Sequence, residues 1–174
     1  MGRVAIDFEA SCLPRHGRSF PIEVAICGPE GVRSWLITPH AGWREWEWTD
    51  EAARLHRITR ADLARDGQAP ALVFSELMRA IAGRRVLADS HLDADWFALL
   101  AQAAGSPVRA RVEHAGLLLD EIGASAAHIE TARRFADRHC HARHRAGPDA
   151  RWLWCLLARL ELIVPIRTPL RKAA

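Results

Sequence analysis

Val4-Ala5-Ile6-Asp7-Phe8-Glu9, near the start of the chain, alternates bulky apolar residues with small or acidic ones. Alternation with a period of two predicts a β-strand, because successive side chains of a strand point to opposite faces. Asp7 and Glu9 then share one face of that strand. Two neighbouring carboxylates repel each other unless a cation lies between them, so this face of the strand is a candidate metal-binding site. An acidic pair on a solvated strand face is the simpler alternative.

A second acidic position opens a predicted helix in the middle of the chain. Asp93 shares a helix face with Trp96, Phe97 and Leu100, which follow it at spacings of three, four and seven residues. An acid on the same side as core residues is a candidate ligand. The alternative is a first-turn Asp that complements the helix dipole.

A third acidic position lies near the end of the sequence. Gly147 and Pro148 are typical of a helix start, and Asp149 would occupy the first turn. His144 precedes the helix and lies five residues before Asp149. Dipole complementation is again the simpler alternative for the acid.

The order of these motifs along the chain resembles that of the DEDDh family of 3′ to 5′ exonucleases. This is the superfamily of ribonuclease T and of the proofreading subunit of bacterial replicative polymerase. The motifs are Asp7 and Glu9 on a strand, Asp93 on a middle helix, and His144 with Asp149 at the last helix. The chain contains no tyrosine, which excludes the sister subtype with Tyr in its third motif and leaves His144 for that role.

Other segments support the resemblance, and two positions depart from it. Residues 20–24 are similar to the family's second strand, and residues 55–59 to the segment after its third strand. The spacing ahead of the second acidic motif is one residue short, so Asp89 and Asp95 remain alternatives to Asp93. Arg57 replaces the Gly that usually follows the His of the 55–59 segment.

The resemblance implies the activity and the cofactors. We expect a metal-dependent exonuclease that hydrolyses the 3′ end of single-stranded DNA or RNA and releases nucleoside 5′-monophosphates, with two divalent cations, Mg²⁺ or Mn²⁺. Asp7 would bridge both cations, Glu9 and Asp149 would hold the one beside the nucleophile, and Asp93 would hold the other through water. His144 would take the proton from the attacking water. A catalytically silent nucleic-acid-binding module is the alternative, and a homodimer is possible.

The expected fold class is α/β, and the resemblance implies a ribonuclease H-like mixed five-stranded sheet flanked by helices. Three strands would form an antiparallel meander, and later strand–helix alternation predicts parallel pairing. One domain is expected over residues 1–167, with a flexible tail over 168–174. The predicted strands are 4–9, 22–27, 32–37, 85–88 and 108–112, and the predicted helices are 49–56, 59–65, 71–82, one from Asp93, 115–122, 126–140 and 148–162.

Aromatic residues offer candidate contacts to unpaired bases. Trp43, Trp46 and Trp48 cluster in one segment, and stacking on such rings holds single strands without reading sequence. The alternative is a loop folded over the core by its own aromatic residues. Phe8, next to the acids, and Phe20, by family resemblance, are further substrate-binding candidates with Trp46. Phe8 points away from Asp7 in an ideal strand, so core packing is its default role.

A histidine-rich run suggests a different metal site. His139, His141 and His144 flank Cys140, and imidazole with thiolate could hold Zn²⁺. Residues 139 and 141 point to different sides of one helix, and no partner pair lies elsewhere, so surface histidines are the simpler interpretation. The four scattered cysteines favour reduced, mostly buried thiols: Cys12, Cys27, Cys140 and Cys155.

Charge and composition give weaker evidence about function and location. The net charge is +3, with 23 Arg and one Lys, which suits a protein that follows phosphates, although biased codon usage also produces arginine. The chain shows no basic and apolar leader and no apolar run long enough to span a membrane, so we expect a cytoplasmic protein without membrane contact.

Overall fold

The computed structural model describes residues 2–107, 110–141 and 144–164. Its centre is a five-stranded sheet in the order β3-β2-β1-β4-β5. β1 and β2 are antiparallel, as are β2 and β3, whereas β4 runs parallel to both β1 and β5. The strands are β1 (Arg3–Ala10), β2 (Pro21–Gly28), β3 (Gly31–Leu36), β4 (Arg85–Ala88) and β5 (Val112–His114).

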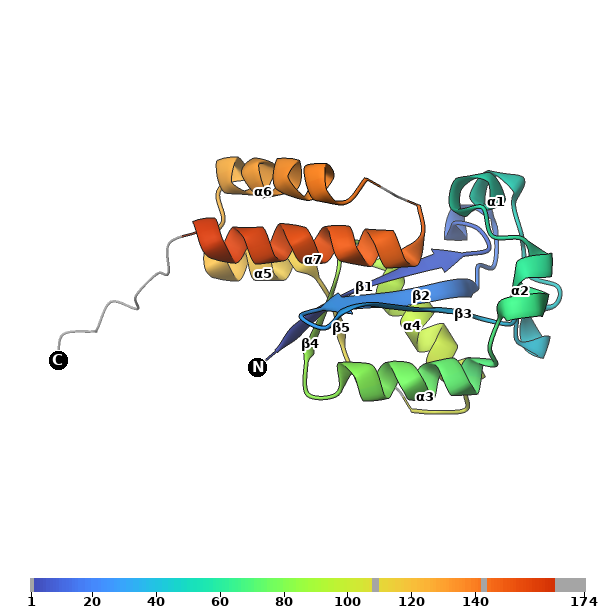
Figure 1. Ribbon diagram of the computed structural model, residues 1–174. Helices are drawn as coiled ribbons and strands as arrows, with labels where there is room; N and C mark the ends of the chain where they lie inside the picture. Colours follow the sequence, from blue (N-terminus) through green and yellow to red (C-terminus); the bar gives the residue numbers. More distant parts are fainter. Residues whose placement is uncertain (1, 108–109, 142–143, 165–174) are drawn as a thin grey trace.

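Helices cover both faces of the sheet (Figure 1). α5, α6 and α7 lie on one side, α3 and α4 on the other, and α1 and α2 lie beyond the carboxyl end of β1. Within the described ranges, no helix is both long and apolar enough to cross a membrane. The helices are α1 (Asp50–His56), α2 (Arg60–Asp66), α3 (Pro70–Ile81), α4 (Leu92–Ala103), α5 (Ala115–Ile122), α6 (Ala126–His139) and α7 (Ala146–Ile163), with 3₁₀ turns at Pro14–His16 and Ala41–Trp43.

The mixed sheet expected from the sequence is confirmed, with one strand displaced. The predicted strand at 108–112 is wrong over residues 110 and 111, because β5 begins only at Val112 and continues to His114. Its pairing is limited by the short β4, whose Val86 lies opposite Val112 and whose Ala88 lies opposite His114. Residues 108 and 109 and the expected tail over 168–174 lie outside the described residues.

The period-two pattern of β1 separates two cores. Val4, Ile6 and Phe8 are buried in the larger cluster, which includes residues of α3 and α4. Ala5 packs on the opposite side in the cluster formed with α5, α6 and α7. Asp7 and Glu9 continue the Ala5 face toward the carboxyl end of the strand, where the apolar layer gives way to carboxylates.

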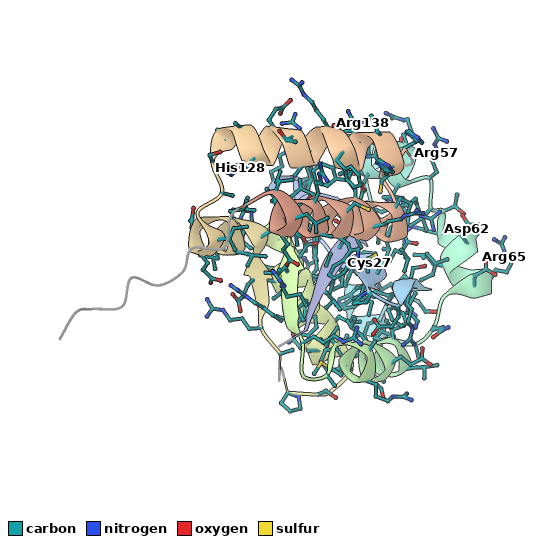
Figure 2. All side chains as sticks on the ribbon, turned by 60° about the vertical axis from the view of Figure 1, so that its left-hand side comes forward. Cys27, Arg57, Asp62, Arg65, His128 and Arg138 are labelled. Atoms are coloured by element: carbon teal, nitrogen blue, oxygen red, sulfur yellow. The ribbon has the colours of Figure 1, made fainter. Side chains whose placement is uncertain are left out.

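Arg57 ends α1 in the left-handed region, with φ 58° and ψ 26°. Its side chain is exposed at the surface beside α1 (Figure 2). The turn that glycine usually makes is therefore retained by an L-residue with a side chain, at a steric cost of about 1–2 kcal/mol.

Replacing that side chain should stabilise the fold. We expect Arg57→Gly to raise the free energy of unfolding by about 0.5–1 kcal/mol, since relief of the steric clash exceeds the added flexibility of the unfolded chain. Urea denaturation of the variant and the wild type measures the change. Arg54→Gly, within the same helix, should have the opposite effect, and a loss of stability in both variants would contradict the explanation.

Candidate active site

Three carboxylates from the two ends of the chain meet on one face of β1. Oxygen atoms of Asp7, Glu9 and Asp149 lie within 4.8 Å of one another. Asp149 reaches this place because α7 packs closely on β2, where Ala146 and Ala150 of the helix are buried against the small residues of the strand. Small side chains at the contact let the helix approach the sheet and bring its first turn over the acids of β1.

A second group of carboxylates shares Asp7. Oxygen atoms of Asp7, Asp89 and Asp93 also lie within 4.8 Å of one another. Asp89 directly follows β4, and Asp93 lies in the first turn of α4. The backbone N–H of Phe8 donates to Asp93 Oδ1 at 3.1 Å, which ties the helix to β1.

Asp93 is nearly inaccessible to solvent, with 1% of its surface exposed. Its Oδ2 atom has no hydrogen-bond partner among the described residues. An unsatisfied buried carboxylate oxygen is costly unless a cation binds it. Asp89, weighed in the sequence as a competitor of Asp93, instead lies beside it, whereas the exposed Asp95 belongs to neither group.

His144 lies two residues before the start of α7 and has a left-handed backbone conformation, with φ 65°. Its backbone N–H donates to Asp149 Oδ2 at 2.8 Å. The side chain is exposed. Histidine is among the residues that tolerate this backbone region, and the local hydrogen bond fixes the approach to the helix.

A buried ion pair holds the start of α7 to β2. Glu23 is 3% exposed and lies opposite Glu9 in the antiparallel register. Arg145 donates to both Glu23 oxygens, at 2.9 Å from Nε and 2.8 Å from Nη2, and the Ala146 N–H adds a third bond at 3.1 Å. Arg145 is also the backbone acceptor of the Asp149 N–H. Neither Glu23 nor Arg145 was singled out in the sequence, although a lone acid within the apolar strand 21–28 was a signal.

Removing the guanidinium should destabilise the fold. Arg145→Gln leaves Glu23 buried without its cation, and we expect a loss of about 2–3 kcal/mol, below the range for a fully buried pair because Arg145 is 41% exposed. Chemical denaturation measures the loss, and adding Glu23→Gln should recover much of it. Arg85→Gln is the matched control, since its partners Glu113 and Glu121 are nearer to solvent. Equal losses in both single variants would contradict this account.

The crowded acids hold protons in the absence of metal. Burial raises the pKa of Asp7 well above its ordinary value, and the charges of Asp93 and Glu9 add to the effect. Burial, with Asp149 and Glu23, raises the pKa of Glu9 to about 8, although Arg145 opposes the shift. Burial and then Asp89 raise the pKa of Asp93 to about 8. Such a site favours a cation, which removes the like-charge repulsion.

These raised pKa values predict how stability changes with pH. In the metal-free protein the folded state holds protons on Glu9 and Asp93 up to about pH 8, whereas the unfolded chain releases them near 4.5 and 3.8. The free energy of unfolding therefore falls as pH rises through this window. Burial lowers the pKa of His56 to about 4, which acts in the opposite direction, but only below its ordinary pKa of 6.5.

Between pH 6.5 and 8 the carboxyl groups should therefore decide the slope. We expect the melting temperature in chelator to fall across this range, and the gain produced by Mn²⁺ to grow. Thermal unfolding in matched buffers measures both. The double variant Glu9→Gln with Asp93→Asn should have a smaller slope, because only the contribution of Asp7 remains. A wild-type melting temperature that rises in chelator would contradict the assignment.

A pocket of about 110 Å³ opens beside Glu9. Its lining is mostly apolar and includes Phe8, Leu13, Leu55 and Trp96, with the buried His56. The Nδ1 atom of His56 accepts from the Ile58 N–H at 3.0 Å, while Nε2 has no hydrogen-bond partner in the described part of the chain. This histidine was not predicted from the sequence as a site residue.

The other aromatic candidates lie away from this pocket lining. Phe20 is fully buried and stacks on Trp43, with ring centroids 5.5 Å apart. Trp46 is half-buried, its centroid 6.3 Å from that of Trp43, and Arg18 lies over its ring. The tryptophan segment thus folds back on the core.

The histidine-rich run forms no metal group. Among the residues that the structure describes, both groups of three or more potential ligands consist of carboxylates, and neither contains His139, Cys140, His141 or His144. His139 instead bonds the Phe135 carbonyl through Nδ1 at 2.7 Å. The four cysteines are free thiols; Cys140 and Cys155 approach to 3.5 Å between sulfur atoms, and Cys27 lies in the interior (Figure 2).

Comparison with known proteins identifies the architecture. No protein-family model matches the sequence, and no curated protein matches it. Solved structures with similar folds include a full-length 3′-exonuclease, with 15% identity, a TM-score of 0.58, and coverage of 91% of this chain and 60% of that chain.

Two structures of E. coli exonuclease I are also similar. The complex with a dT13 oligonucleotide has 10% identity and a TM-score of 0.66, covering 92% of this chain and 41% of that one. The zinc ion-bound complex with single-stranded DNA has 11% identity and a TM-score of 0.64, covering 92% and 40%. The chain thus spans only 40 to 60% of the length of these three structures. The chain has the fold of these exonucleases.

Proposed function

We propose that this chain is a metal-dependent 3′ to 5′ exonuclease that shortens single-stranded nucleic acid and releases nucleoside 5′-monophosphates. The observation that carries the proposal is the pair of carboxylate groups that share Asp7 at one end of the sheet. The fold similarity to exonucleases, some crystallised with single-stranded DNA, supports the same activity.

The donors fit hard divalent cations such as Mg²⁺ or Mn²⁺. Both groups offer only carboxylate oxygens, which these cations prefer, and the buried Oδ2 of Asp93 lacks another partner within the described ranges. Asp7 would hold both cations, Glu9 and Asp149 one of them, and Asp93 the other. Two such cations supply an activated water and neutralise the charge that develops on the phosphate.

The remaining roles fall to side chains around the acids. His144 would accept the proton of the attacking water, a task suited to an imidazole near neutral pH. The apolar pocket beside Glu9 would take the terminal nucleotide, with Phe8 against it. Phe20 and Trp46, away from the lining, would support this region through the aromatic core rather than contact the base.

Digestion of matched RNA and DNA oligonucleotides, labelled at either end, tests the proposal. With Mg²⁺ or Mn²⁺, a 3′ label should be released at once as a mononucleotide, and a 5′-labelled strand should shorten stepwise; chelator should stop both. Release from the 5′ end or internal cuts would contradict it. Stabilisation by Mn²⁺ without any cleavage would instead identify a silent nucleic-acid-binding module.

A further inference from the structure

Asp89 occupies a place that the strand register creates. β4 runs parallel to β1 with Ala5 opposite Leu87, so continuing that register by two residues sets Asp89 beside Asp7. Parallel strands end at the same edge of a sheet, and this is the edge where the acids of β1 gather. Asp89 therefore reaches the site from the sheet, independently of the α4 helix that carries Asp93.

The backbone at Asp89 is anchored. His114 Nδ1 accepts from the Gly116 N–H at 3.1 Å, which leaves the ring proton on Nε2. That Nε2 lies 3.0 Å from the Asp89 carbonyl oxygen and can donate to it. His91 stacks on His114 with ring centroids 4.3 Å apart. The residue after β4 is thus fixed by its main chain, while its carboxylate faces Asp7 and Asp93.

An independent observation points to a ligand at this position. Asp93 is almost completely buried, contributes a carboxylate oxygen to the same group, and has an oxygen, Oδ2, without a hydrogen-bond partner among the described residues. The ionised form of such a buried side chain is stabilised by a cation, and a cation bound there lies within reach of all three acids.

We propose that Asp89 is a direct ligand of the cation held between Asp7 and Asp93, so that this second cation has three carboxylates rather than two. The proposal deepens the proposed function, since it rests on the same pair of cations. An additional anionic oxygen strengthens the binding of a hard cation and replaces a bound water. The second cation would then be retained at low metal concentration and in the absence of nucleic acid.

Mn²⁺ binding without nucleic acid tests the assignment. Titration followed by electron paramagnetic resonance counts bound Mn²⁺ and gives the affinity of each event. We expect two ions per wild-type chain, and in Asp89→Asn a tenfold or greater loss of affinity for one event while the other is unchanged. Asp95→Asn, in the first turn of α4, is the matched control and should change both affinities less than twofold.

Two other results overturn the assignment, and a third separates it from the proposed function. Equal affinities in Asp89→Asn and the wild type would show that Asp89 is not a ligand. Equal losses of Mn²⁺ affinity in Asp89→Asn and Asp95→Asn would show that Asp89 acts only through its negative charge and not as a ligand. Failure of wild-type protein to digest oligonucleotides while it binds two Mn²⁺ would remove the proposed function and leave the Asp89 result standing. Thermal unfolding in chelator verifies that each variant is folded.

Discussion

The Asp7→Asn variant should cleave oligonucleotides at least about 100-fold more slowly than the wild-type protein. In chelator the variant should nevertheless have the higher melting temperature. Asp7 belongs to both carboxylate groups, so its loss weakens both cation positions at once. Even residues that only orient a metal ligand cost 10- to 100-fold when changed, and a shared ligand should cost more. The gain in stability follows because burial raises the pKa of Asp7, so the folded metal-free protein must keep this acid protonated, at a cost that the neutral amide does not carry.

Initial rates with saturating Mn²⁺ and melting curves in chelator measure the two opposite effects of Asp7→Asn. Asp95→Asn removes an exposed carboxylate outside both groups and should alter neither quantity appreciably. Retention of activity by Asp7→Asn would refute the role of the carboxylate groups. A fall in the melting temperature would show that keeping Asp7 protonated does not reduce the stability of the metal-free protein.

His144→Ala should lower kcat by about 10²- to 10⁴-fold while Mn²⁺ still binds as in the wild type. The side chain belongs to neither carboxylate group, and the bond to Asp149 comes from the backbone N–H, which alanine keeps. The geometry of the acids should therefore persist without the imidazole. Only the proton acceptor is lost.

The pH dependence of kcat separates this role from a structural one. The variant should show a pH profile of a different shape from that of the wild type, because the proton acceptor is gone, whereas a merely structural change would scale the whole profile. His141→Ala is the matched control, because it removes an exposed imidazole from the same loop. Full activity of His144→Ala across neutral pH would contradict its assignment as general base.

The strand that carries the first two acids could be predicted because its period is local. The alternation over residues 4–9 fixed both the buried face and the acidic face, and the structure has both. The start of β5 could not be predicted, because it depends on which residues of β4 are free to pair. Strand ends are set by neighbours, not by the pattern of the strand itself.

The site was predictable in part for a similar reason. Asp93 shares a helix face with core residues, and helix periodicity selects it over the exposed Asp95. Asp89 could not be recognised as its companion, since the register between β1 and β4 is a tertiary property. Glu23 and Arg145 are far apart in sequence, and only the docking of α7 brings them together.

The long separation between β1 and α7 has a consequence for protein synthesis. β1 and β2 are neighbours in sequence and pair early by a short connection, whereas Asp149 arrives only when α7 docks on that pair. A ribosome-bound chain that has not yet released α7 would carry the acids of β1 without Asp149, so the group of Asp7, Glu9 and Asp149 would be incomplete. The two carboxylate groups that share Asp7 are therefore both complete only after α7 has docked.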